Sequence, residues 1–148
     1  MDKKKNTELY NLKVSLDEGA FMPTRAHPED AGLDLYSMKT DLVPAGGSCI
    51  FDTGFHIQIP PGYVGMVKSK SGLLFKHGLV SEGTIDSGYT GSVKVKLVNL
   101  SKKDYFIEKG DRISQLVILP IMYPISLQIA EELEETERGE SGFGASGK

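Results

Sequence analysis

The residues best suited to chemistry lie in short glycine-bearing segments that are spread along the chain. In the segment "KSKSGLLF", Lys70, Ser71 and Gly72 stand at the start of a brief predicted helix. Free backbone N–H groups and the helix dipole at such a start attract an anion such as phosphate. Most serines in this position only cap a helix, so the segment by itself is a weak indication of a phosphate site.

A carboxylate and a tyrosine share the segment "GTIDSGYTG", which reads as a β-hairpin. Asp86 and Tyr89 lie near its turn, and Gly88 and Gly91 are expected to supply positive φ angles. An ordinary Asx-type turn explains the same residues, and the segment alone does not decide between the two interpretations.

Two strand-like segments carry further polar side chains. In "AGLDLYS" both leucines are expected to face the core, which places the Asp34 carboxylate on the opposite face of the strand. An exposed strand aspartate is the simpler explanation for this residue. In "KGDRISQL", Asp111 and Arg112 read as an ion pair at the start of a strand, with Gln115 further along.

The chain ends in "RGESGFGASGK", directly after the acidic run "EELEETE". Small polar residues at a terminus usually mark a solvated tail. Arg138, the aromatic plane of Phe143 and the backbone N–H groups of residues 142–147 could nevertheless grip a base and a phosphate together. The acidic run could form a helical turn, but because its like charges repel one another a solvated arm is the expectation.

The histidines and the single cysteine do not suggest a metal or a nucleophile. His27, His56 and His77 are far apart and have no cysteine or second histidine at ligand spacing, so a zinc site has little support. Cys49 lies inside a strand-like run, where a buried and inert thiol is usual. A single cysteine also excludes an internal disulfide.

Period-two alternation of apolar residues predicts the strands that must position these side chains. Turn-forming pieces such as "PAGG", "PPGY" and "EKGD" recur at short intervals, which favours an all-β sandwich or barrel over a βαβ fold. One brief helix is expected at "SGLLFK", with Ser71 as its cap and its apolar residues docked on the sheet. Alternating strands are expected at residues 10–16, 55–59, 93–97 and 125–129, and further strands in "LDLYSM", "SCIFDTG", "YVGMVKS" and "RISQLVILPIMY".

The whole-chain composition limits the class of protein. With 148 residues, 39% of them apolar and 25% charged, the chain suits one globular domain. A net charge of −3 gives no general attraction to nucleic acid or anionic lipid, so any anion site must be local. The start "MDKKKNTE" has no apolar leader, and no apolar stretch is long enough to cross a membrane. A soluble cytoplasmic protein is expected, or one in a host cytoplasm if a phage encodes it.

Taken together and in order, these five segments resemble the motifs of the trimeric dUTPase family, the deoxyuridine triphosphate nucleotidohydrolases, from Ala31 to the C-terminus. The resemblance implies a distorted jelly-roll β-sandwich and a homotrimer with active sites at the subunit interfaces. It implies a β domain over residues 1–130 and a mobile arm over residues 131–148 that completes a neighbouring subunit's site. The implied reaction is hydrolysis of dUTP to dUMP and pyrophosphate, which keeps uracil out of DNA and supplies dUMP for thymidylate synthesis.

The family's functional residues carry over to the matching positions of this sequence. Asp86 matches the general base that activates a water for attack on the α-phosphorus. Tyr89 matches the residue whose ring lies against the deoxyribose and excludes a 2′-hydroxyl. Uracil is expected to be read by backbone groups around Gly83, Thr84 and Ile85 and near Lys94.

The resemblance also assigns the phosphate end of the nucleotide. Asp34 matches a carboxylate that hydrogen-bonds water on Mg²⁺, the implied cofactor, which the three phosphates chelate. From the arm, Phe143 is expected to stack on uracil and Arg138 to hold the γ-phosphate. Further phosphate contacts are expected from Lys70, Ser71, Gly72, Gln115, Gly144, Ala145 and Ser146.

Two departures from the family pattern affect these phosphate contacts. Lys70 stands where the family usually has arginine. Lysine keeps the positive charge but lacks the planar guanidinium that binds a phosphate through two N–H groups at once. Ala145 replaces a residue that usually carries a hydroxyl. Altered affinity is expected and not lost activity, because the backbone amides of the arm remain.

Two other functions stay open on the sequence. A dCTP deaminase shares the fold and the phosphate contacts, but it generally has a glutamate in the hairpin as its base, where this chain has Asp86 with Tyr89. The second alternative is a non-catalytic β-sandwich that binds nucleotides or a regulatory protein. The placement of Asp86, Arg138 and Phe143 argues against a module without catalysis.

Overall fold

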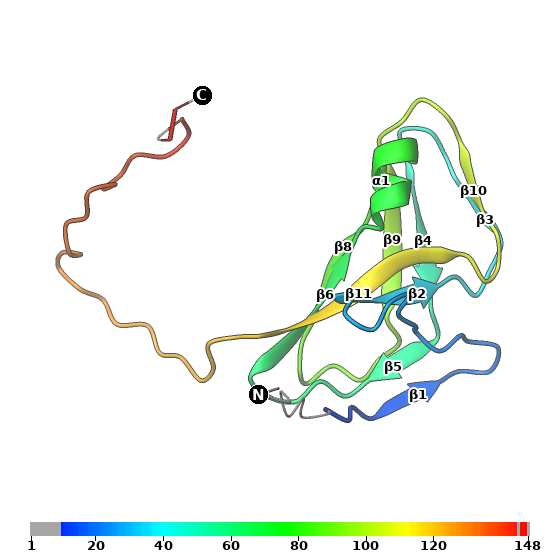
Figure 1. The fold of residues 1–148 in the computed structure, drawn as a ribbon, viewed down its shortest axis with the longest axis horizontal. Coiled ribbons are helices and arrows are strands. Elements are labelled where there is room, and N and C mark those ends of the chain that lie inside the picture. Colours follow the sequence, from blue (N-terminus) through cyan, green and yellow to red (C-terminus); the bar gives the residue numbers. More distant parts are fainter. Residues whose placement is uncertain (1–9, 145, 148) are drawn as a thin grey trace, which may run out of the picture.

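Antiparallel strand pairing dominates the fold, as the alternating sequence patterns predict. The computed structural model describes residues 10–144, 146 and 147, and within them the chain forms eleven β-strands and one helix (Figure 1). Every pair among these strands is antiparallel, which confirms the all-β prediction. The elements in chain order are β1 (Val14–Leu16), β2 (Gly32–Tyr36), β3 (Asp41–Val43), β4 (Ser48–Asp52), β5 (Phe55–Ile57), β6 (Tyr63–Lys68), α1 (Ser71–His77), β7 (Leu79–Val80), β8 (Glu82–Ile85), β9 (Lys94–Asn99), β10 (Tyr105–Ile107) and β11 (Arg112–Pro120).

Two sheets make up the body of the molecule. One has four strands in the order β2-β11-β6-β8, and the other has three strands in the order β4-β9-β7. Two short ribbons, β1-β5 and β10-β3, complete the pairing. Burial of apolar side chains from both sheets in one core fixes the strands that carry the candidate residues. Core side chains that are at most 1% exposed include Leu35, Phe51, Val67, Val95 and Leu116.

Strands β8 and β9 belong to different sheets, so the hairpin predicted over "GTIDSGYTG" is wrong. β8 pairs with β6, whereas β9 pairs with β4 and β7. The chain turns at Asp86, whose carbonyl accepts the Tyr89 N–H at 3.0 Å, and then crosses to the other sheet. Neither Gly88 nor Gly91 has the positive φ that was expected. The local turn does not specify the partner of β9, which is set by long-range pairing with β4.

Helix α1 differs in detail from the prediction. Lys70, not Ser71, is the N-cap residue, and no side chain caps the helix. Leu73 packs against the core, but Phe75 is 85% exposed and so does not dock on the sheet as expected. The helix ends at Gly78, whose φ of 67° is the left-handed conformation that favours glycine. In the described part of the chain, no helix is long and apolar enough to cross a membrane.

Apolar alternation predicts burial well in the middle of the chain and poorly towards its ends. Residues 55–59 and 93–97 alternate as expected, with Ile57 and Val95 buried. β1 forms within the predicted segment 10–16, but each of its residues is exposed. Residues 125–129 form no strand, and Ile129 is 99% exposed. The expected strand fails here because the segment runs away from the sheets and pairs with none of the strands in the described residues.

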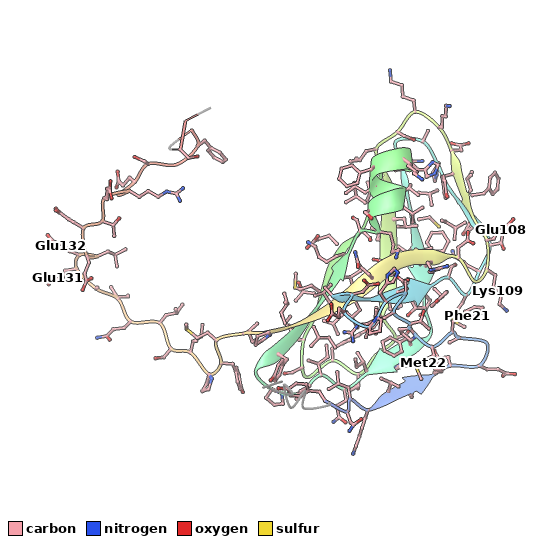
Figure 2. The ribbon with its side chains drawn as sticks, in the orientation of Figure 1. Phe21, Met22, Glu108, Lys109, Glu131 and Glu132 are labelled. Carbon is pink, nitrogen blue, oxygen red and sulfur yellow. The ribbon has the colours of Figure 1, made fainter. Side chains whose placement is uncertain are left out.

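The C-terminal segment leaves the body after β11. β11 ends at Pro120, residues 121–144 are exposed throughout, and the boundary expected at residue 130 stays a prediction. The segment runs away from the sheets in Figure 1, and Glu131 and Glu132 lie far from the labelled body residues in Figure 2. The acidic run contains no helix, which confirms that part of the prediction.

Candidate active site

One pocket gathers the residues of the "GTIDSGYTG" segment. It has a volume of about 280 Å³ and is formed by β6, β8, β9 and the loop that joins β8 to β9. Six candidate residues from the sequence analysis meet there, although β8 and β9 pair with different strands. The lining residues are Val67, Gly83, Thr84, Ile85, Asp86, Tyr89, Ser92 and Lys94.

Backbone groups of β8 are available at this pocket because β8 is an edge strand. Its sheet partner is β6, with Val67 opposite Gly83 and Gly65 opposite Ile85. The outer side of an edge strand presents N–H and C=O groups that the sheet ladder does not use. A planar base with its own donors and acceptors can bind such an edge, much as an added strand does.

The loop after β8 holds the Tyr89 ring against its own backbone. The Tyr89 hydroxyl donates to the Ser92 carbonyl at 2.9 Å, and the residue is still 43% exposed. A Cβ on Gly91 would lie 2.5 Å from the Tyr89 Oη, so only glycine leaves room for the ring in this position. The orientation of the ring is therefore fixed, while much of it stays accessible to a ligand.

Val67 and Ser92 are lining residues that sequence reasoning missed. Val67 reaches the pocket through the register of β6 with β8, which one strand's sequence does not reveal. The Ser92 hydroxyl donates to the Asp52 carboxylate at the end of β4, a contact between residues 40 positions apart. The sequence feature that could have identified Ser92 as a pocket residue was its position in the same polar loop as Tyr89.

A second group of candidate residues meets on the four-stranded sheet. The register places Gln115 of β11 opposite Asp34 of β2 on one side and opposite Lys68 of β6 on the other. The Gln115 amide donates to the Ser69 carbonyl at 2.9 Å, directly before Lys70. Strand β11 thus brings three segments that are far apart in sequence into contact.

Asp34 is buried between two cations, so the simpler explanation of an exposed strand aspartate is wrong. It is 4% exposed, and its Oδ1 accepts from the Lys70 Nζ at 2.5 Å while its Oδ2 lies 3.7 Å from the Arg112 Nη1. The chain at Thr24 forms an isolated bridge with Asp34 and shields this end of the strand. Arg112 therefore pairs with Asp34 and not, as expected, with Asp111, whose carboxylate closes a local turn.

This cluster carries one carboxylate and two cations, an excess of positive charge that suits an anion. Ser71 and Gly72 follow Lys70 as the exposed first residues of α1. The residues that the structure describes contain no group of three or more His, Cys, Asp or Glu side chains that could hold a metal. A divalent cation here would need most of its ligands from the molecule it accompanies, as Mg²⁺ commonly does with phosphates.

The candidate residues of the arm are presented to solvent and do not meet either group within this chain. Phe143 is fully exposed, and the Arg138 Nε–H donates to the Ser141 carbonyl at 3.1 Å in a local turn. Gly144 has a φ of 83°, and Ser146 is exposed. Ala145 lies outside the described residues.

Sequence comparison places the chain in a known family. The dUTPase family model matches residues 18–147. The chain is 40% identical over 143 residues to a deoxyuridine 5'-triphosphate nucleotidohydrolase of Clostridium acetobutylicum, covering 94% of this chain and 98% of that relative. It is 43% identical over 151 residues to one of Candida albicans, covering 100% of this chain and 95% of the relative. The chain therefore belongs to the dUTPase family.

Solved structures of dUTPases share the fold. The dUTPase of Staphylococcus bacteriophage 80alpha with dUPNHPP has a TM-score of 0.85 and 36% identity, covering 95% of this chain and 100% of the other. A dUTPase mutant from phage phi11 of S. aureus, whose structure reveals the coordination of a structural Mg(II) ion, has a TM-score of 0.78 and 32% identity. That likeness covers 85% of this chain and 100% of the other. The family resemblance seen in the five segments is confirmed, and the fold is that of a dUTPase.

Proposed function

We propose that this chain hydrolyses dUTP to dUMP and pyrophosphate in a cytoplasm, which removes a source of uracil in DNA and supplies dUMP for thymidylate synthesis. The observation that carries the proposal is the pocket beside β8, where the Asp86 carboxylate and the Tyr89 ring flank the edge of a strand. Membership of the dUTPase family supports the same substrate class.

The edge of β8 suits the uracil and the sugar. Backbone groups of β8 offer donors and acceptors at a fixed spacing, as a pairing base does. The Tyr89 ring, held by its bond to the Ser92 carbonyl, lies against the deoxyribose and excludes a 2′-hydroxyl. Selection between dUTP and UTP therefore depends on the position of this ring. The residues that recognise uracil are Gly83, Thr84 and Ile85, and Lys94 lines the same pocket.

Asp86 acts as the general base in this proposal. Its exposed position at the pocket allows it to accept a proton from a water held in line with the α-phosphorus. The water oxygen bonds to phosphorus, its proton passes to the Asp86 carboxylate, and the bond to the bridging oxygen of pyrophosphate breaks. An aspartate suffices because positioning and charge neutralisation carry most of phosphoryl transfer.

The cluster around Asp34 binds the phosphates. Lys70 leaves Asp34 for the nucleotide, and Arg112 stays close enough to neutralise the carboxylate. Mg²⁺ chelated by the phosphates would neutralise their charge, and Asp34 would contact its water shell. One carboxylate flanked by two cations fits such an indirect contact better than direct ligation. The remaining contacts come from Ser71, Gly72 and Gln115.

A homotrimer with shared sites completes the proposal. The arm extends away from the body of its own subunit, which supports a role on a neighbouring one (Figure 1). A row of exposed apolar side chains at Ile125, Leu127 and Ile129 needs a partner surface. On the neighbour, Phe143 stacks on uracil and Arg138 holds the γ-phosphate. Gly144 and Ser146 supply backbone and hydroxyl contacts.

A substrate panel tests the proposed activity. Pyrophosphate release with Mg²⁺ is measured for dUTP, dTTP, dCTP and UTP on one preparation, and a preference for dUTP of at least about a hundredfold is expected. Ammonia released from dCTP would show a deaminase instead. Binding of dUPNHPP without turnover of any of the four nucleotides would show a non-catalytic module.

A further inference from the structure

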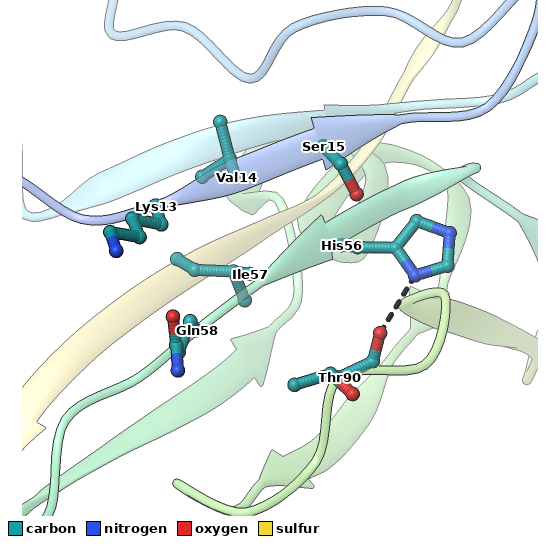
Figure 3. A pocket seen from close by; sticks show the side chains of 7 residues that line it. All are labelled: Lys13, Val14, Ser15, His56, Ile57, Gln58 and Thr90. Carbon is teal, nitrogen blue, oxygen red and sulfur yellow. Dashed lines mark hydrogen bonds between the residues drawn. The ribbon is translucent and has the colours of Figure 1, made fainter.

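A second pocket, of about 260 Å³, lies between β1, β5 and the loop that carries Asp86 and Tyr89 (Figure 3). His56 of β5 and Thr90 of the loop both line it, and a hydrogen bond joins them. This bond links the N-terminal half of the fold to the loop that is proposed to select the sugar.

His56 contacts one acceptor with each nitrogen of its ring. Its Nδ1 lies 2.8 Å from the Thr90 carbonyl oxygen, and its Nε2 lies 3.0 Å from the Asp17 Oδ1. Neither a carbonyl nor a carboxylate oxygen can donate. A neutral imidazole has one N–H and satisfies one of these acceptors, whereas an imidazolium satisfies both. The geometry therefore matches a protonated ring.

The corner between β4 and β5 holds the end of the same loop. The Ser92 hydroxyl donates to the Asp52 carboxylate, and the Thr53 hydroxyl donates to the Val93 carbonyl at 2.6 Å. These contacts fix the loop from Ser92 onward. His56 forms a hydrogen bond with the carbonyl of Thr90, two residues before Ser92, and so holds the loop closer to Tyr89.

The Thr90 carbonyl belongs to the peptide that joins Thr90 to Gly91. Gly91 is the residue against which the Tyr89 ring packs, where a Cβ would lie 2.5 Å from the ring hydroxyl. A rotation of this peptide would move the surface that supports the ring. The hydrogen bond from His56 opposes that rotation.

We propose that His56 is a positioning residue of the site, and that its bond to the Thr90 carbonyl fixes the Tyr89 ring and thereby sets the discrimination between dUTP and UTP. This inference rests on the proposed function, because the ring meets a deoxyribose only if dUTP is the substrate. His56 itself touches neither the nucleotide nor the reacting atoms.

The charges around His56 make this support depend on pH. The Asp17 carboxylate after β1 and the Asp52 carboxylate at the end of β4 favour the imidazolium, and desolvation of the ring opposes it. Lys13 is the cation that lines the same pocket. The hydrogen bonds to the Thr90 carbonyl and to Asp17 raise the pKa of His56 above its ordinary value. Below that pKa the ring donates to both partners.

Above the pKa of His56 the ring keeps a single N–H. A charged acceptor takes the stronger hydrogen bond, so the neutral ring donates to Asp17 and releases the Thr90 carbonyl. Asp52 stays ionised over this range. Burial of Asp52 opposes its charge, but hydrogen bonds from Ser92 and Gly54 outweigh it and lower the pKa of this carboxyl. The loss of support is therefore confined to the bond between His56 and Thr90.

Three substitutions separate the two bonds of His56. An asparagine amide takes the place of Nδ1 and a glutamine amide that of Nε2, so His56→Asn keeps the donor to Thr90 and His56→Gln keeps the donor to Asp17. His56→Ala keeps neither. We expect the ratio of kcat/KM for dUTP over UTP to fall about tenfold in His56→Gln and His56→Ala, and to stay within about threefold of wild type in His56→Asn.

An equal loss of selectivity in His56→Asn and His56→Gln, or none in either, would overturn the inference. These two variants differ by one methylene, so their comparison holds even if His56→Ala folds poorly. Wild-type chain that turns over dUTP is the reference for each ratio. If wild type released no pyrophosphate from dUTP, the proposed function would fail first and the inference with it.

The pH profile provides a second test on the full-length protein. The selectivity of wild type is expected to fall as pH rises through the pKa of His56, which ring NMR signals measure directly. In Asp17→Asn the amide retains an acceptor without the charge, so both the pKa and the fall in selectivity move to lower pH. A wild-type ratio that stays constant while the His56 ring titrates would contradict the proposal.

Discussion

The Lys70 ammonium donates to the Asp34 carboxylate at 2.5 Å and joins the start of α1 to strand β2. The Asp34 side chain is 6% exposed, and Arg112 approaches its second oxygen at 3.7 Å. The cation proposed to hold phosphate is thus already paired in the free protein. Nucleotide binding must exchange this partner for a phosphate oxygen.

The burial of Asp34 predicts that its pair with Lys70 contributes to stability. A double-mutant cycle with Asp34→Ala and Lys70→Ala is expected to give a coupling of about 1–2 kcal/mol in the free energy of unfolding. The matched control is the exposed pair of Lys68 and Glu82, 3.0 Å apart, where at most about 0.5 kcal/mol is expected. Equal coupling in the two pairs, measured by denaturant unfolding, would contradict a role for burial.

Removal of the proposed base is expected to separate binding from turnover. Asp86→Asn keeps the size of the side chain but cannot take a proton from water, so kcat for dUTP should fall about a thousandfold. The dissociation constant for dUPNHPP, measured by calorimetry, should stay within about threefold of wild type. Near-normal turnover in this variant would exclude Asp86 as the base.

Two loop glycines offer a test of the Tyr89 ring position without removal of the ring. In Gly91→Ala the new methyl group meets the Tyr89 hydroxyl at 2.5 Å and must displace the ring, so discrimination between dUTP and UTP should fall about tenfold. Gly88→Ala is the control, because no atom lies within 4 Å of a Cβ there. Steady-state kinetics with both nucleotides would refute the steric role of Tyr89 if the two variants behaved alike.

Deletion of residues 138–148 is expected to remove activity without unfolding the body. Arg138 and Phe143 are exposed and outside the core, so the melting temperature should change by no more than about 2 °C, while kcat/KM falls about a hundredfold. Normal hydrolysis by the truncated protein would rule out a catalytic role for the arm.

Mixed assemblies test whether the arm acts on a neighbouring subunit. Truncated chains supply Asp86 and the Asp86→Asn chains supply an arm, so refolding the two inactive variants together should recover part of the activity. Recovery requires a site that draws on two chains. If each arm served its own subunit, the mixture would stay inactive.

The stability that His56 contributes should decrease with rising pH. Its folded-state pKa is raised by the Thr90 carbonyl and Asp17, so the contribution is complete below the ordinary pKa of about 6.5. It is lost as pH rises through the raised pKa of the folded protein. The difference in melting temperature between wild type and His56→Ala, followed from pH 5 to 9, checks this, and a difference that grew with pH would have the wrong sign.

Local sequence patterns predicted much of the fold and the members of the pocket. The alternation at residues 55–59 and 93–97 depends on burial of one strand face, which period-two spacing reports directly. The residues from Gly83 to Tyr89 are contiguous, so a single turn brings them together whichever strand β9 joins. Because these residues are adjacent in sequence, the sequence placed them in one pocket correctly even though the predicted pairing of β8 with β9 was wrong.

Long-range pairing explains most of what the sequence did not show. The partner of Arg112 is Asp34 because β11 lies beside β2, and nothing in "KGDRISQL" specifies that neighbour. Ser92 depends in the same way on Asp52, because β9, which begins two residues after Ser92, pairs with β4, whose last residue is Asp52. The apolar alternation at residues 125–129 predicts a strand, but it carries no information about which surface the strand would cover.

The open edge of β8 also affects the solubility of the protein. A bare row of N–H and C=O groups is where a second chain can add a strand and begin to aggregate. β8 limits this hazard, because it spans only Glu82–Ile85 and its first residue carries a charge that pairs with Lys68 at 3.0 Å. Bound nucleotide would cover the same groups, so the substrate itself would protect the folded protein from aggregation through this strand edge.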